Sequence, residues 1–104
     1  MKKLVRDLIP AIIKNNGQSC EIRVLENEEY KEALRQKLQE EMQEYLTAKT
    51  NEETIGELAD LLEVMYALTR CHESSREELE RVRAKKEQER GAFRDKIFLE
   101  GISE

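Results

Sequence analysis

Two short groups of acidic residues are the strongest candidates for a functional site in this sequence: Glu40-Glu41-x-x-Glu44 and Glu57-x-x-Asp60. Twelve residues separate the two groups. Residues three or four apart on a helix share a face, so two antiparallel helices would direct four or five carboxylates into one small volume. Like charges so close raise pKa values and destabilise the fold unless a cation neutralises them. Because hard divalent cations prefer oxygen ligands, the spacing predicts a magnesium site between two helices.

The alternative is that these acids form the solvated faces of amphipathic helices, which is the usual role of glutamates in a Glu-rich helix. Solvated faces normally mix signs, because Glu–Lys pairs four residues apart stabilise a helix by a few tenths of a kcal/mol. No Lys or Arg lies between Lys49 and Arg70, although five acidic residues lie there. Asp60 is flanked by apolar residues, and Glu41 continues the helical spacing of two leucines. A carboxylate near a packed face needs a partner, so these observations favour metal binding.

The apolar spacing predicts the two long helices that would position these acids. Asn27 is the expected cap of a helix from about 28 to 48, whose apolar residues recur at helical intervals. The capping-box pattern Thr50-x-x-Glu53 starts a second helix, from about 52 to 72, which is the most apolar of the chain.

The N-terminal part predicts one short helix and one short strand. Asp7 is the expected cap of the helix, with Pro10 in its first turn and a stop at Gly17. Residues 19 to 25 alternate apolar and polar side chains, which is typical of a strand.

The C-terminal part predicts a charged helix, opened by the capping pattern Ser75-x-x-Glu78 and ended by Gly91. The apolar residues 97 to 99 suggest a second short strand. We therefore expect an all-α domain, a helical bundle of about four principal helices with minor strand-like segments, assembled as a homo-oligomer.

The composition supports a single domain, residues 1–104, with a thin core. Hydrophobic residues make up 38% of the chain and charged residues 39%, and there is no Trp, so burial against a second copy would help most and we expect a dimer or tetramer. The net charge of −5 argues against nucleic-acid polymers as partners. Cys20 and Cys71 lie far apart, no apolar run reaches the roughly 20 residues of a membrane span, and the polar N-terminus does not suggest a secretory signal. We expect a cytoplasmic protein with reduced thiols and no membrane partner.

The acidic pattern, Glu-Glu-x-x-Glu followed after twelve residues by Glu-x-x-Asp, resembles the signature of the all-α nucleoside triphosphate pyrophosphohydrolases, the MazG-like group. Other segments resemble, in the same order, one small single-domain branch of that superfamily: Lys3-Leu4-Val5-Arg6-Asp7-x-Ile9-Pro10, Lys37-Leu38-x-Glu40-Glu41, Glu57-Leu58-Ala59-Asp60-Leu61-Leu62-Glu63-Val64 and Lys86-x-x-x-Arg90-Gly91-x-Phe93. The resemblance implies a helical, oligomeric, house-cleaning enzyme that uses Mg²⁺ to cleave the α–β phosphate bond of a nucleoside triphosphate. The products would be a nucleoside monophosphate and pyrophosphate.

By position, the resemblance assigns the metal to Glu41, Glu44, Glu57 and Asp60, and it makes Glu40 a further ligand or a base that orients the attacking water. Glu40 and Glu41 are therefore the candidates for catalysis. Phosphoryl transfer needs neutralised phosphate oxygens and an in-line nucleophile, with little covalent work for the protein, which suits these residues. The nearest enzymatic alternative is a phosphoribosyl-ATP pyrophosphohydrolase, which is similar in fold and chemistry. An alternative of another class is a non-catalytic helical module for assembly or binding.

An anionic nucleotide needs cations besides magnesium, and four basic residues are candidates for binding it: Lys86, Arg90, Lys3 and Arg6. From composition alone, we interpret the helix that carries Lys86 and Arg90 as a solvated, charge-mixed helix. The resemblance of Lys86, Arg90, Gly91 and Phe93 to the family pattern reverses that preference. For Arg6, a structural salt bridge with a helix carboxylate is an equal alternative to phosphate binding.

Overall fold

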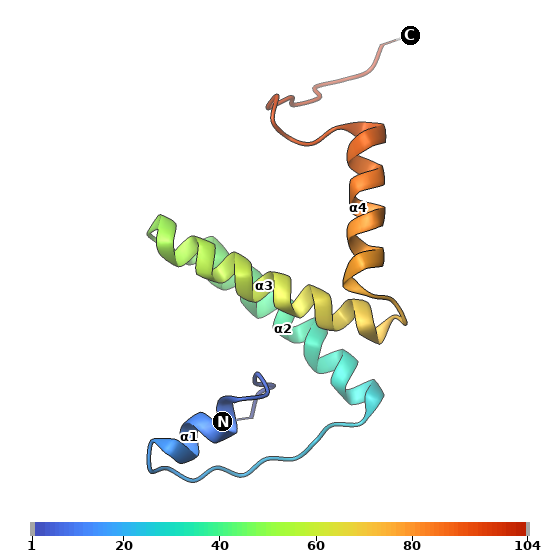
Figure 1. Cartoon of the computed structure of the whole chain (residues 1–104). Helices are drawn as coiled ribbons and strands as arrows, with labels where there is room; N and C mark the ends of the chain where they lie inside the picture. Colours follow the sequence, from blue (N-terminus) through green and yellow to red (C-terminus); the bar gives the residue numbers. More distant parts are fainter. Residues whose placement is uncertain (1, 104) are drawn as a thin grey trace.

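A computed structural model describes residues 2–103, and its regular structure consists of four α-helices (Figure 1). They are α1 (Ile9–Asn15), α2 (Asn27–Thr47), α3 (Asn51–Cys71) and α4 (Arg76–Arg90). The two long helices, α2 and α3, lie antiparallel and side by side, and we call this pair the hairpin (Figure 1). The predicted all-α class is confirmed. None of the helices formed by the described residues combines the length and hydrophobicity that crossing a membrane requires.

The turn of the hairpin is fixed by the predicted capping box. The Thr50 hydroxyl oxygen accepts a hydrogen bond from the Glu53 backbone N–H at 3.1 Å. The Glu53 carboxylate in turn accepts the backbone N–H of Lys49 at 3.2 Å, one residue earlier than in the standard box. These bonds satisfy N–H groups that the first turn of a helix leaves free, so α3 starts abruptly and folds back on α2.

The core of the chain lies between the first half of α2 and the second half of α3. Leu34, Val64 and Ala67 are its buried hydrophobic residues. Leu4, from the segment before α1, packs against this cluster. The contact holds the N-terminal segment against the hairpin, beside the helices that carry the acids.

The predicted strands at 19 to 25 and 97 to 99 are wrong. Both segments are irregular, and the part of the chain that the structure describes contains no strand to pair with them. Val24, a central residue of the first alternation, is 90% exposed. An extended segment needs backbone partners from a neighbouring strand, so the alternating pattern alone does not form one here.

Two predicted helix caps are also wrong. The cap position of α1 is Leu8 rather than Asp7, and no side chain caps the helix, although Pro10 does lie in its first turn. The cap position of α2 is Glu26, again without a side-chain hydrogen bond, and Asn27 is already helical. Both long helices begin and end one residue earlier than the sequence predicts.

The end of α3 sets the direction of the rest of the chain. Glu73 has a φ of 61°, the left-handed conformation usually taken by glycine. Its N–H donates to the Arg70 carbonyl, and the N–H of Ser74 donates to the Thr69 carbonyl, both at 3.1 Å. This pair of bonds is a Schellman motif, and it turns the chain sharply out of α3.

The helix α4 starts against α3 and then leaves the hairpin (Figure 1). The Ser75 hydroxyl caps it, accepting the N–H of Glu78 at 3.1 Å as predicted. The Arg76 guanidinium lies 4.2 Å from the centre of the Tyr66 ring, a cation–π contact that holds the first turn against α3. Residues 92–103 are irregular.

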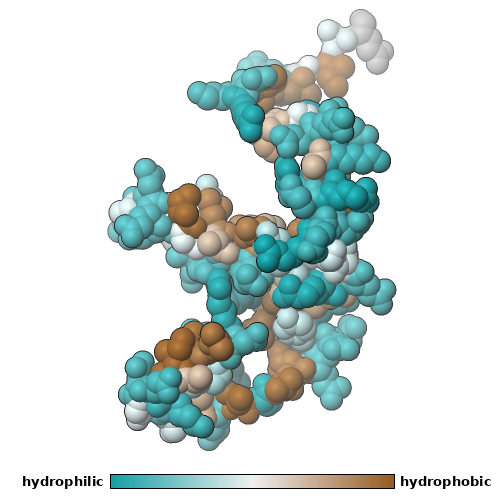
Figure 2. Space-filling view, in the orientation of Figure 1, coloured by the Kyte–Doolittle hydropathy of each residue, from teal (hydrophilic) through white to brown (hydrophobic). Residues whose placement is uncertain are grey.

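The described chain is much less compact than a domain of its length. Its radius of gyration is 18.2 Å, whereas a compact domain of about 100 residues has a value of about 13 Å. Figure 2 shows hydrophobic surface at the turn end of the hairpin, around α1 and on the segment after α4. A single copy therefore leaves much of its apolar surface in contact with water.

Candidate metal centre

Three of the five acids singled out in the sequence meet between the two long helices. Glu41 and Glu44 come from α2 and Glu57 from α3, and one carboxylate oxygen of each lies within 4.8 Å of those of the other two. Glu41 is only 7% exposed, Glu57 is half-buried and Glu44 is exposed. We call these three residues the acidic group; it runs from the interior of the hairpin to its surface.

Two oxygens of the acidic group are buried without a hydrogen-bond partner among residues 2–103: Oε2 of Glu41 and Oε2 of Glu57. The other oxygen of Glu41 lies 3.7 Å from the ammonium of Lys37, beyond hydrogen-bonding distance. Leaving a buried carboxylate oxygen without a partner is costly. A cation held between these carboxylates would give both oxygens a partner that residues 2–103 do not supply.

The pKa values of the acidic group are displaced in the direction that this crowding requires. Burial raises the pKa of Glu41, and the charges of Glu44 and Asp60 raise it further, against a smaller opposing effect of Lys37. Burial also raises the pKa of Glu57, and the neighbouring carboxylate of Glu44 raises it further. A bound cation favours the ionised carboxylates and opposes these shifts.

Asp60 is placed one turn beyond Glu57 on α3, but it is paired with Arg6. Its Oδ1 accepts a hydrogen bond from the Arg6 guanidinium at 2.6 Å, and both side chains are partly exposed. The structure thus places Arg6 in the salt bridge that the sequence left open as an alternative. Asp60 lies outside the acidic group in this arrangement.

Glu40 is exposed and lies beside Lys37, whose ammonium is 4.0 Å from it. Lys37 is the base nearest to the acidic group, and it is not among the site residues that the sequence predicts. Its positions three residues before Glu40 and four before Glu41 are the signal that identifies it. It partly neutralises both carboxylates from within α2.

The predicted basic residues of α4 do not reach the acidic group of their own chain. Lys86 and Arg90 lie in the distal half of α4, which points away from the hairpin (Figure 1). Within residues 2–103 no ion pair involves Lys86, Arg90 or Lys3. Among the residues that the structure describes, these three cations therefore have no ion-pair partner.

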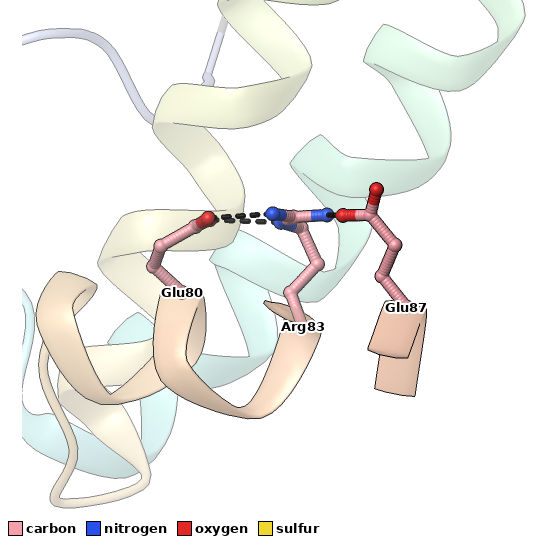
Figure 3. A network of polar contacts seen from close by, with 3 residues as sticks. All are labelled: Glu80, Arg83 and Glu87. Carbon is pink, nitrogen blue, oxygen red and sulfur yellow. Dashed lines mark hydrogen bonds and ion pairs between the residues drawn. The ribbon is translucent and has the colours of Figure 1, made fainter. Parts of the chain in front are cut away.

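Two other arginines of α4 pair with glutamates of the same helix, and Figure 3 shows one of them, Arg83. Arg83 donates to Glu80 at 2.7 and 2.9 Å and to Glu87 at 2.9 Å. Arg81 pairs with Glu78 in the same way. The interpretation of α4 as a solvated, charge-mixed helix thus fits its paired arginines.

The comparisons with known proteins do not assign the chain to a family. No protein family model matches the sequence, and no solved structure matches it. An uncharacterised protein of Mycolicibacterium smegmatis is 44% identical over 52 residues, which are 50% of this chain and 53% of that protein. The chain spans about half the length of this relative. The resemblance to the MazG-like group stays a prediction.

Proposed function

We propose that this protein is a Mg²⁺-dependent nucleotide pyrophosphohydrolase that cleaves the α–β phosphate bond of a nucleoside triphosphate, with noncanonical nucleotides among its substrates. The observation that carries the proposal is the acidic group with its two unpartnered oxygens, on Glu41 and Glu57. All of its donors are carboxylate oxygens, the ligands that Mg²⁺ prefers, and it contains no thiol or imidazole that would favour zinc.

In this proposal Glu41, Glu44 and Glu57 hold the ion. Asp60 joins them when it is released from Arg6, since it lies one turn along α3 from Glu57. Bound magnesium polarises phosphoryl oxygens and lowers the pKa of a coordinated water. Glu40 remains on the solvent side of α2, where its carboxylate can orient a water molecule and accept its proton.

The same release frees Arg6 for the substrate. Its guanidinium lies beside the acids through Asp60, and guanidinium groups bind phosphate oxygens in bidentate geometry. The contact of Leu4 with the core keeps this segment close to the site. Arg6 therefore acts first as the partner of Asp60 and then as a phosphate ligand.

The test is product analysis with a panel of canonical and noncanonical triphosphates and phosphoribosyl-ATP, in Mg²⁺. We expect pyrophosphate and a monophosphate, and a loss of at least about a hundredfold in kcat/KM for Glu57→Gln. Glu80→Gln on α4 makes the same chemical change outside the acidic group and should retain activity.

Release of orthophosphate instead of pyrophosphate would contradict the proposed bond cleavage. Turnover of phosphoribosyl-ATP alone would favour the narrower enzyme named as the alternative. Absence of turnover and of metal binding would favour a non-catalytic helical module.

A further inference from the structure

We propose that residues 79–99, here called the arm, dock on the hairpin of a second copy of this chain and bring Lys86 and Arg90 to that copy's acidic group. The role given to the two cations depends on the proposed function. The docking itself depends on the charge, the exposed apolar residues and the direction of the arm, which are independent of the reaction.

The two surfaces carry opposite charges. Residues 40–63 of the hairpin contain eight acidic residues and one basic residue, whereas the arm contains seven basic and four acidic residues. Of the arm's cations, Arg81 and Arg83 are paired with glutamates of α4, but Lys86 and Arg90 are unpaired within residues 2–103. Complementary charge of this kind selects partners and fixes the register of an interface.

Both surfaces also carry exposed apolar side chains. One face of α3 packs on α2, but a second row of large residues, Ile55, Leu58, Leu62 and Met65, is between 38% and 66% exposed. Its intervals of three, four and three residues are those of helices packed against a partner. Leu58 of this row lies about 100° around α3 from Glu57, so a segment that covers the row lies beside the acidic group, within reach of long basic side chains.

The arm supplies apolar residues to match this row. Four of its large side chains, Phe93, Ile97, Phe98 and Leu99, are between 71% and 99% exposed. Contiguous apolar surface of this kind marks an interaction site. The cations of the arm therefore match the acids of the hairpin, and its apolar residues match the exposed row on α3.

The direction of α4 favours a second copy over the arm's own hairpin. The left-handed Glu73 and the contact of Arg76 with Tyr66 direct α4 away from the hairpin at its first turn (Figure 1). The helical part of the arm is about 18 Å long, and its irregular part adds up to about 30 Å. This length spans the roughly 30 Å of a 21-residue helix. Two copies that exchange arms about a twofold axis form a closed pair.

The apolar area is sufficient for a stable pair. Buried phenylalanines contribute about 150–250 Å² each, so Phe93 and Phe98 of two exchanged arms contribute about 600–1,000 Å² on the arm side alone. The surface that they cover adds a similar area. The total lies in the range of standard stable interfaces, about 1,200–2,000 Å².

The first experiment is complementation between two defective chains. One chain carries Glu57→Gln in the hairpin, and the other carries Lys86→Gln and Arg90→Gln in the arm. The two are co-expressed with different affinity tags and purified through both tags. If the arm acts on the second copy, each mixed pair has one intact hairpin facing one intact arm, and we expect about half of the wild-type rate of pyrophosphate release.

If the arm serves its own hairpin, neither site of the mixed pair is intact. Activity no higher than that of the separate variants would then overturn the proposal. A matched arm variant, Arg81→Gln with Arg83→Gln, removes two cations that are already paired, and it should stay active without complementation.

The second experiment does not depend on activity. The wild-type protein is prepared with natural and with heavy nitrogen, the two batches are unfolded and refolded as one mixture, and a carbodiimide joins lysines to neighbouring carboxylates. We expect peptides of mixed isotope that link Lys86 to residues of 40–63. Links found only within one isotope, or an unmixed monomer, would overturn the docking. If the mixed links form but no nucleotide is hydrolysed, the proposed function fails and the docking stands.

Discussion

The hairpin and α4 contain the same kinds of charged residue, but the pKa values of their glutamates are shifted in opposite directions. On α4, hydrogen bonds from Arg81 and Arg83 lower the pKa values of Glu78 and Glu80. In the hairpin, burial and neighbouring carboxylates raise the pKa values of two glutamates of the acidic group. The chain itself stabilises Glu78 and Glu80 of α4 as anions, whereas it disfavours the ionised forms of Glu41 and Glu57.

The difference arises because the charges of α4 meet within one helix, whereas those of the hairpin meet only through tertiary packing. Positions three and four apart on one helix pair acids with bases as soon as α4 forms. The acids of the hairpin converge only when two helices pack, and α3 carries no base before Arg70. Charges that a helix neutralises locally support the fold. Like charges that the tertiary structure gathers oppose the fold, and they are the basis of the metal site that we propose.

The largest effect should follow from breaking the acidic group itself. Glu41→Gln removes its most buried carboxylate, and we expect the affinity for Mn²⁺, as a probe of the proposed Mg²⁺ site, to fall by about a hundredfold or more. Titration calorimetry measures the affinity. The metal-free variant should melt at a higher temperature than the wild type, because a like charge is gone. The same substitution on α4, Glu80→Gln, should leave the Mn²⁺ affinity unchanged and should not raise the melting temperature. An equal loss of Mn²⁺ affinity in both variants would contradict the difference between the hairpin and α4.

A smaller effect, of opposite sign, should follow from releasing Asp60. Arg6→Gln removes the guanidinium that holds this carboxylate, and Mn²⁺ should then bind up to about fivefold more tightly, since exposed ion pairs contribute at most about 1 kcal/mol. Arg23→Gln is the matched control, because it breaks a pair of equal length with Glu29 away from the site. Weaker Mn²⁺ binding in Arg6→Gln would show that Arg6 positions Asp60 for the metal.

The parts of the fold that the sequence predicted are those specified locally. The two long helices follow from apolar spacing, and Thr50 and Ser75 cap their helices with the side chains expected. The predicted strands failed because pairing depends on a second strand, which a single apolar alternation does not supply. Asp7 failed as a cap because the chain turns one residue later, at Leu8.

The same division between local and long-range features applies to the candidate site. The spacing of Glu41 and Glu44 and the position of Glu57 were sufficient to place them on facing helices. The pairing of Asp60 with Arg6 depends on how the segment before α1 lies on the hairpin, and no local pattern specifies that. The direction of α4 is set by Glu73, whose left-handed conformation is not expected for a glutamate.

The pH dependence should separate the two regions further. A carboxyl whose pKa is higher in the folded protein than in the unfolded chain binds more protons when folded, so stability falls as pH rises between the two values. For Glu41 and Glu57 this window begins at the ordinary value of 4.5 and extends upward. The lowered pKa values of Glu78 and Glu80 act only below it.

We therefore expect the metal-free protein to melt a few degrees higher at about pH 5 than at about pH 7. Saturating Mn²⁺ should reverse the order, because metal binding requires ionised carboxylates. Thermal melts followed by circular dichroism measure both. A metal-free protein that is less stable at the lower pH would contradict the assigned electrostatics.

The smallest effect should follow from breaking the α4 network. Arg83→Gln removes the hydrogen bonds to Glu80 and Glu87 (Figure 3), but all three side chains are in contact with solvent, where screening by water and salt makes ion pairs weak. The melting temperature should fall only slightly at low salt and match the wild type at about 1 M salt. Mn²⁺ affinity should be unchanged, since Arg83 is paired within α4 and is not one of the two cations that we assign to the acidic group. A change in metal affinity would mean that the paired charges of α4 also act on the acidic group.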